Sequence, residues 1–388
     1  MALRIRTVCT AAALVPLALL AAACGSSSGG ASASSSPSAS SSAAKMLGAA
    51  LPSAPAKTPE SITETGSTLL FPLFGTWSTA YQKLYTPTGG TPPVTITTGG
   101  TGSGTGITDA STGTVNIGAS DAYLSSADVS KYPGLLNIAL AISAQQINYY
   151  VPGVKKLNLD GTVLAQIYTG KITTWNNPAI KALNPGVPLP NLKIITLHRA
   201  DSSGDTFLFT SFLNAQDPSA WPSSNVNTTV SWPSVPGSLA ETGNSGMVAG
   251  CAANKGCIAY IGISYLQKTQ AAGLGEAYLK NASGKYELPT PATISAAAAA
   301  FTAKTPANET ISMINGPAPG GYPIVNYEYA IVKTSQSNAA QAEDMRAFLH
   351  WIVTAGQNAT TYLDTVNFVP LPASVVAQSD AQIAKIGS

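Results

Sequence analysis

Apolar and polar residues follow one another along the chain with the periods of helices and strands. Residues 66–85 predict a helix, because their large apolar residues recur every three or four positions and Pro72 falls where a first turn tolerates proline. The apolar positions of this helix are Leu70, Phe74, Trp77, Tyr81 and Leu84. Val94 and Ile96 then alternate as in a strand, before a glycine-rich loop and a short helix expected from Ile107.

The same order of strand, loop and helix returns further along. Residues 115–119 alternate as a strand that delivers Asp121 at its end, and residues 192–213 predict a strand through Leu197, a loop and a helix. Further helices are expected in residues 160–172, 178–183, 294–304, 340–356 and 358–366, and further strands in 257–266 and 323–332. This alternation predicts an α/β protein with ligands at the ends of its strands.

Three of the predicted loops place hydroxyl groups and unpaired backbone amides where a helix begins. They contain Ser67 with Thr68, Ser103, and Ser203 with Gly204. Helix N-termini hold oxyanions through their amides and the helix dipole. Any one of these loops is explained by ordinary capping. Three together, one of them beside Arg199, predict an anion pocket.

Aspartates in the same loops indicate which anion is bound. A carboxylate beside an anion is repulsive unless the anion donates a proton to it, and phosphate at neutral pH carries such a proton whereas sulfate does not. Asp121 and Asp205 are therefore expected to accept P–O–H hydrogen bonds, while Arg199 and the amides donate to the bare oxygens. The alternative for each aspartate is structural: Asp121 ends a strand and Asp205 caps a helix.

The sequence motifs give little support to a nucleotide site, a serine-hydrolase site or a metal site. The stretch GGTGSGTG has no lysine after its glycines and lacks the dinucleotide spacing, so nucleotide binding is not expected. No G-x-S-x-G surrounds Ser203, and His198 points away from the site if its strand neighbour Arg199 points in. With His198 and His350 as its only histidines, the chain predicts no catalytic residues, no metal and no cofactor.

The N-terminus has the pattern of an export signal. A basic head with Arg4 and Arg6 precedes an apolar run from Ala11 to Ala23 that is too short to span a bilayer. LAAAC resembles a bacterial lipoprotein signal, which implies cleavage after residue 23 and a lipid on Cys24. The Gly/Ser/Ala/Pro-rich stretch that follows predicts an unfolded tether over residues 24–57. We therefore expect a protein anchored by lipid to the extracytoplasmic face of the cell membrane.

Cysteines and charge agree with that compartment. Cys251 and Cys257 are the two cysteines left for the folded body, and in an oxidising space they predict a disulfide. The rival, half of a zinc site, needs two more ligands. The formal charge of +2 comes from 20 Lys+Arg and 18 Asp+Glu, and loss of Arg4 and Arg6 with the signal leaves the mature chain neutral. A general field for nucleic acid is absent, so any bound anion needs local donors.

Five motifs follow one another between about Glu64 and the C-terminus: ETGSTLLFPLF, TGSGTGI, VNIGASDAYLS, LHRADSSGDTFLFTSFL and GCIAYIGISYL. In sequence and order they resemble the substrate-binding lipoproteins of high-affinity phosphate ABC transporters, the PstS family. By motif position, the resemblance implies phosphate contacts from Ser67, Thr68, the backbone N–H of Leu69, Ser103, Asp121, Arg199, Ser203, Gly204 and Asp205. Many members have threonine in place of Asp205 and glycine in place of Ser202. Asp205 is accordingly expected either to favour protonated phosphate or to pair with Arg199.

The resemblance also implies a periplasmic-binding-protein fold of type II, with a ligand cleft between two lobes joined by two crossover strands. Lobe I would contain residues 58–145 and 323–388, and lobe II residues 146–322. Such a protein captures inorganic phosphate and delivers it to the permease subunits of an ABC transporter for import, without catalysis. Two alternatives stay open at this point: a cell-surface adhesin or antigen that retains the fold, and a phosphatase-like enzyme.

Overall fold

The protein is described by a computed structural model that covers residues 51–52, 54–56, 58 and 60–387. The signal peptide predicted over residues 1–23, the lipid-bearing Cys24 and the tether as far as residue 50 lie outside these residues. Near the end of the predicted tether, Leu51 packs against the core and the Ala56 amide donates to Asp344 Oδ1 at 2.5 Å. In the part of the chain that is described, no helix combines the length and the apolar character needed to cross a membrane.

Nine strands of the described residues join in one sheet, in the order β2-β1-β3-β12-β4-β8-β6-β7, with β9 paired to β4. They are β1 (Glu60–Gly66), β2 (Val94–Thr97), β3 (Ile117–Ser120), β4 (Leu135–Tyr149), β6 (Ile195–Arg199), β7 (Leu239–Glu241), β8 (Cys257–Gly262), β9 (Gly275–Glu276) and β12 (Val325–Lys333). A smaller sheet contains β5 (Asn158–Leu159), β10 (Tyr278–Lys280) and β11 (Tyr286–Glu287).

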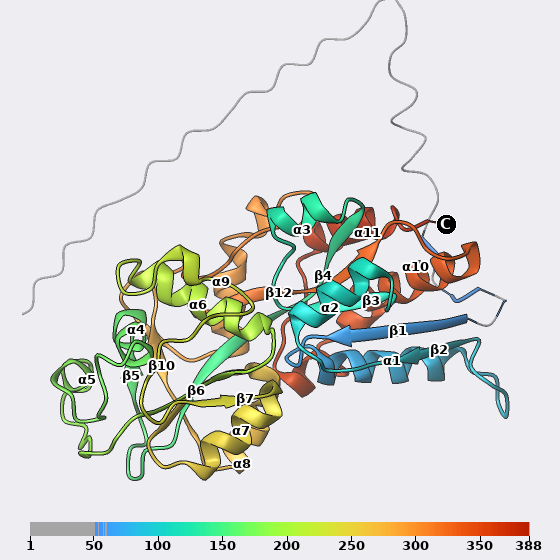
Figure 1. The fold of residues 1–388 in the computed structure, drawn as a ribbon. Coiled ribbons are helices and arrows are strands. Elements are labelled where there is room, and N and C mark those ends of the chain that lie inside the picture. Colours follow the sequence, from blue (N-terminus) through green and yellow to red (C-terminus); the bar gives the residue numbers. More distant parts are fainter. Residues whose placement is uncertain (1–50, 53, 57, 59, 388) are drawn as a thin grey trace, which may run out of the picture. The chain divides into compact units, whose positions relative to one another are not determined.

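The middle of the large sheet is antiparallel, whereas each end is parallel. Strand β1 runs parallel to β2 and β3, and β6 runs parallel to β7 and β8. Between these groups, the fifteen-residue strand β4 pairs with β12 as far as Ala144 and with β8 from Gln145 onward. Figure 1 shows β4 running from the neighbourhood of β3 toward β6. The predicted lobe boundary at residues 145 and 146 lies at this change of partner, and the division into lobes stays a prediction.

Helices cover the sheet at both ends. Helix α1 packs on β2, α10 on β1 and α11 on β4, while α6 and α7 pack on β8 (Figure 1). The helices are α1 (Phe71–Tyr85), α2 (Ser103–Thr112), α3 (Ser126–Lys131), α4 (Gly161–Tyr168), α5 (Pro178–Leu183), α6 (Gly204–Gln216), α7 (Gly243–Ala253), α8 (Leu266–Ala271), α9 (Pro291–Ala299), α10 (Ala339–Val353) and α11 (Ala373–Ile383). The prediction of an α/β protein is confirmed.

Helix α1 illustrates how the apolar spacing acts. Its first turn carries a proline, and Phe74, Trp77 and Tyr81 are buried on one face. Trp77 also donates its indole N–H to the carbonyl oxygen of Gly356 at 2.9 Å, so this large side chain is buried without an unmade hydrogen bond. Leu84, in the last turn, is 60% exposed and lies outside the core that the spacing predicted.

One predicted helix is wrong. Residues 358–366 form only the short 3₁₀ turn Leu363–Val366. The Asn358 side chain accepts a hydrogen bond from the Thr361 amide at 2.9 Å, and such local bonds compete with helical ones. Asn367 follows in the left-handed region with φ of 60°, which ends the turn. The last helix, α11, lies beyond the segments that the pattern selected.

The predicted disulfide between Cys251 and Cys257 is present, with an S–S distance of 1.99 Å. It joins the last turn of α7 to the first residue of β8. Both cysteines are fully buried, so the bridge belongs to the core.

Candidate functional site

The candidate site lies where the parallel strands of both groups end. The turn after β1 holds Ser67, and Asp121 follows β3 directly. On the other side, Arg199 is the last residue of β6, and Asn244 follows β7 at the start of α7. Ligands of α/β proteins bind beyond the carboxyl ends of parallel strands, because loops and helix N-termini meet there. Every strand end named here contributes a polar side chain to one buried cluster.

The turn after β1 depends on Gly66. Its φ of 143° lies outside the range of most side chains, and a Cβ at this position would lie 2.0 Å from the carbonyl oxygen of Ala119. The chain then turns so that Ser67 Oγ accepts the amides of Leu69 at 3.1 Å and Leu70 at 2.8 Å. The Leu69 N–H, which was predicted to face phosphate, is thus bound to Ser67.

Asp121 is the acceptor at the centre of the first group. The Ser67 hydroxyl donates to Asp121 Oδ1, and the Ser103 hydroxyl donates to Oδ2 at 3.3 Å. Burial raises the pKa of Asp121 to about 7, and the negative charge of Asp205 acts in the same direction. The neighbouring Glu328 carboxyl, the Ser67 hydroxyl and the positive charge of Arg199 lower it. Asp121 is therefore ionised above about pH 7 and stays an acceptor there.

Arg199 supplies the positive charge. Its Nε donates to Asp201 Oδ1 at 2.7 Å, a terminal nitrogen donates to Asp201 Oδ2, and Nη1 donates to Asp205 Oδ2 at 2.7 Å. These bonds use three of the five N–H groups of a guanidinium and leave two for another acceptor. Of the two roles expected for Asp205, the structure shows the pair with Arg199.

Asn244 connects the two sides of the cluster. Its amide nitrogen donates to Thr68 Oγ1 at 2.9 Å and to Asp205 Oδ2 at 2.7 Å, while its oxygen accepts the amide of Gly262 at 2.8 Å. Gln145, on β4, donates to Asp205 Oδ1 at 3.1 Å. Asp205 is fully buried, and burial raises its pKa, which the bonds from Arg199, Asn244 and Gln145 oppose.

The start of α6 completes the cluster. A Cβ added to Gly204 would lie 2.5 Å from both Asp121 Oδ2 and Ser103 Oγ, so only glycine permits this approach. Ser203, the residue before α6, makes no side-chain cap. Its Oγ is buried and lacks a hydrogen-bond partner among the described residues. Buried hydroxyls are rarely left in this state without a functional reason.

All of the residues predicted for the site belong to this cluster, although their role toward a ligand stays a prediction. Sequence reasoning missed Asp201, Asn244, Gln145 and Glu328. Asp201 stood two residues after Arg199, and Asn244 stands in a fourth Ser/Thr/Gly-rich helix start, TGNSGM, so both had a local signal. Gln145 and Glu328 lie in the long strands β4 and β12, where no loop marked them.

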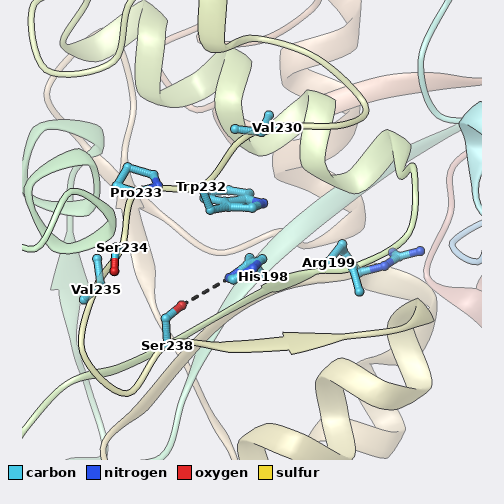
Figure 2. A pocket seen from close by; sticks show the side chains of 9 residues that line it. His198, Arg199, Val230, Trp232, Pro233, Ser234, Val235 and Ser238 are labelled. Carbon is cyan, nitrogen blue, oxygen red and sulfur yellow. Dashed lines mark hydrogen bonds between the residues drawn. The ribbon is translucent and has the colours of Figure 1, made fainter.

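His198 lies on the opposite face of β6 from Arg199. Figure 2 shows its ring beside Trp232, with a hydrogen bond to Ser238, whereas the Arg199 side chain points away from this hollow. The lining also includes Val230 and Val235. The other histidine, His350, is bonded to Asp380 at 2.8 Å. Neither imidazole is bonded to a serine of the cluster, and the described residues contain no group of three or more His, Cys, Asp or Glu arranged for a metal.

Comparisons with known proteins agree on one family. Residues 52–355 match the model of the PBP superfamily domain. The phosphate-binding protein PstS of Xylella fastidiosa is 30% identical over 334 residues, which cover 85% of this chain and 86% of that protein. The phosphate-binding protein PstS of Haemophilus influenzae is also 30% identical over 334 residues, covering 86% of this chain and 95% of that protein.

Solved structures show the same fold. A human phosphate binding apolipoprotein has a TM-score of 0.64 at 22% identity, and covers 82% of this chain and 93% of its own. The high affinity periplasmic phosphate-binding protein PfluDING, bound with phosphate, has a TM-score of 0.61 at 24% identity, with 83% and 93% covered. The predicted periplasmic-binding-protein fold is confirmed.

Proposed function

This chain belongs to the PstS family of phosphate-binding proteins, and from that membership we propose that its buried cluster binds one inorganic phosphate. The protein is a solute-binding protein of ABC transport that acts outside the cytoplasm and delivers phosphate to the permease subunits of its transporter. It carries its ligand unchanged and is not an enzyme. The proposal assigns phosphate contacts to the predicted residues from Ser67 to Asp205 and adds Asn244.

The observation that carries the assignment is the Ser203 hydroxyl. It is buried at the N-terminus of α6, next to Gly204, and has no hydrogen-bond partner among the described residues. An anion bound at this helix N-terminus supplies the missing acceptor. The two remaining N–H groups of Arg199 and the first backbone amides of α6 are also hydrogen-bond donors, as an anion site requires. An anion satisfies the whole set at once.

Asp121 supplies the selection among anions. A tetrahedral anion held by these donors brings one oxygen to Asp121, which repels it unless that oxygen carries a proton. Phosphate provides the proton at neutral pH and sulfate does not. The unmade bond and the repulsion against sulfate cost several kcal/mol in a buried site.

Binding requires that part of the internal bonds open and form again around the ligand. Ser67 donates to Asp121, and Asn244 donates to both Thr68 and Asp205, so these polar groups already satisfy one another. The loop with Ser103 touches the loop before α6, where the Gly104 amide donates to the Ser202 carbonyl oxygen at 3.1 Å. Separation of these two loops by a hinge motion of the predicted lobes gives phosphate its way in.

Membrane attachment forms the second part of the proposal. LAAAC and the Gly/Ser-rich stretch after it support a lipid on Cys24 and a tether to the folded body. A single lipid chain binds a membrane only marginally, so stable anchoring implies the multiple chains of a lipoprotein. The adhesin and phosphatase alternatives are not favoured, because the family to which the chain belongs is one of phosphate-binding transport proteins.

Ser203→Ala tests the assignment against a matched control, Ser78→Ala. Ser203 Oγ makes no hydrogen bond within the described residues, whereas Ser78 Oγ donates to the Phe74 carbonyl oxygen at 2.8 Å inside helix α1. Calorimetry with phosphate is expected to give a roughly five- to tenfold weaker affinity for Ser203→Ala, as for one lost hydrogen bond, without loss of thermal stability. Ser78→Ala should lose thermal stability and keep the phosphate affinity of the parent. Unchanged phosphate affinity in Ser203→Ala would contradict the assignment.

A further inference from the structure

A second buried carboxyl lies behind Asp121. Glu328 is on β12, which pairs antiparallel with β3, and Tyr329 lies opposite Ser120 in that pairing. Asp121 follows β3 directly, and extending this register by one residue sets Glu328 opposite it; the effect of each carboxyl on the pKa of the other agrees with this placement. Side chains directly opposite each other in antiparallel strands are on one face, with Cβ atoms about 5 Å apart. Glu328 is 0% and Asp121 2% exposed, so this pair of acids is shielded from water.

Among the described residues, donors bind one carboxyl oxygen of Glu328 and not the other. Oε1 accepts the hydroxyl of Ser143 at 2.5 Å and the amide of Asn326 at 2.9 Å. The same Asn326 amide reaches the carbonyl oxygen of Asp121 at 3.3 Å. Oε2 receives no hydrogen bond from a donor among the described residues. The register of β12 against β4 also shifts between Glu328 and Tyr329, where Leu140 of β4 is left without a pairing partner on β12.

Two buried carboxyls that face each other cannot both be ionised, because like charges at this distance raise the pKa of one of them strongly. Burial and then the charge of Asp121 raise the pKa of Glu328 well above its usual value. The other titratable or charged groups near the pair are Tyr329 on β12, Arg199 at the end of β6 and Asp205 at the start of α6. Arg199 acts on Asp121 and favours its ionised form. The proton of the pair therefore belongs to Glu328.

We propose that Glu328 is a positioning residue of the anion site, whose protonated Oε2 donates a hydrogen bond to the Asp121 carboxylate. This inference rests on the proposed phosphate function of the same cluster. Glu328 holds Asp121 in place from behind and keeps it ionised, so that Asp121 presents an acceptor to the ligand. Asp121 then accepts a hydrogen bond from the protonated oxygen of phosphate, and Glu328 keeps Asp121 negatively charged while it does so.

Two substitutions at Glu328 distinguish the loss of a hydrogen-bond donor from a change in side-chain volume. Glu328→Gln keeps an oxygen for Ser143 and Asn326 and supplies an N–H in place of the carboxyl proton. Glu328→Leu keeps apolar volume and removes the donor. Glu309→Gln is the control for loss of a buried acid elsewhere, because Glu309 is fully buried and bonded to Ser379 at 2.7 Å and to the Ala139 amide at 2.9 Å. Each variant is measured as the full chain.

Phosphate affinity across pH 5 to 9 gives the first readout. Glu328→Leu should bind phosphate about ten- to hundredfold more weakly at pH 7, as expected for loss of a hydrogen bond to a charged group. Its affinity should also begin to fall at a higher pH than in the parent, since Asp121 without its donor takes up a proton more easily. Glu328→Gln should restore most of the affinity and the parent pH profile. Equal losses in the Gln and Leu variants would overturn the proposal.

Infrared spectroscopy of the ligand-free protein at pH 8 gives the second readout. The difference between the parent and Glu328→Gln should show loss of a protonated carboxyl band, and loss of a carboxylate band would overturn the proposal. This reading does not depend on phosphate. If the parent gave no heat with phosphate, the proposed function would fail, while the infrared difference would still decide whether Glu328 holds the proton.

Discussion

Gly204 and Asp121 approach each other so closely that a methyl group on Gly204 would lie 2.5 Å from Asp121 Oδ2. The contact joins the N-terminus of α6 to the end of β3. The helix amides thereby come next to the carboxylate, which gives the site its donors and its acceptor side by side. Burial in this contact and the negative charge of Asp205 raise the pKa of Asp121 to about 7.

Gly204→Ala should weaken phosphate binding by about ten- to hundredfold, because the added methyl forces α6 away from Asp121 and Ser103 at a cost typical of overpacking. Gly320→Ala is the control, since a Cβ at Gly320 meets nothing within 4 Å. Titration calorimetry of both variants with phosphate checks the expectation. Equal affinities for the two variants would show that the close approach is not needed for binding.

Asn244→Ala should reduce both phosphate affinity and stability. The substitution removes the side-chain donor to Thr68 and Asp205 and leaves the buried Gly262 amide without its acceptor, at a cost of about 1–3 kcal/mol. Asn254→Ala serves as the control, because Asn254 donates only to the Gly250 carbonyl oxygen in α7. Calorimetry and denaturant unfolding of the two variants measure the difference. An Asn244→Ala protein with parental affinity would remove Asn244 from the site.

Glu64 should make stability depend on pH. Burial raises the pKa of Glu64 from 4.5 to about 8, so the folded protein binds a proton that the unfolded chain has already lost in this range. Its contribution to the free energy of unfolding is fully present below about pH 4.5 and is lost as the pH rises through 8. The free energy of unfolding of Glu64→Gln, measured relative to that of the parent, should therefore rise by several kcal/mol between pH 5 and pH 8. Denaturant unfolding at both pH values checks this, and parallel pH profiles would contradict the assignment.

The disulfide should contribute stability through the short loop that it closes. Replacement of Cys251 and Cys257 together by serine is expected to cost about 2 kcal/mol, according to the loop-entropy relation for a loop of this length. Reduction of the parent under native conditions should give a similar loss. Unfolding experiments on the oxidised, reduced and serine proteins provide the comparison, and an unchanged free energy of unfolding would exclude the bridge as a stabilising element.

The sequence was sufficient to predict the site residues that lie in a loop directly after a strand. Ser67, Ser103 and Ser203 were predictable because a strand, a Ser/Gly-rich loop and a helix stand next to one another in the chain, and Asp121 because a strand ends there. Glu328 was not, since its place opposite Asp121 follows from the pairing of β12 with β3, whose residues are about two hundred positions apart. The turn at residues 358–366 escaped for another reason: a side-chain bond of Asn358 replaces helical bonds.

The central claim is that the ionised carboxylate of Asp121 selects an anion that carries a proton. Titration calorimetry at pH 8 with phosphate and then sulfate, on the parent and on Asp121→Asn, tests it most directly. The parent should bind one phosphate and give no heat with sulfate, whereas Asp121→Asn, whose amide also donates, should lose this discrimination by at least about tenfold. A parent that binds sulfate as well as phosphate, or a variant that discriminates as well as the parent, would contradict the account.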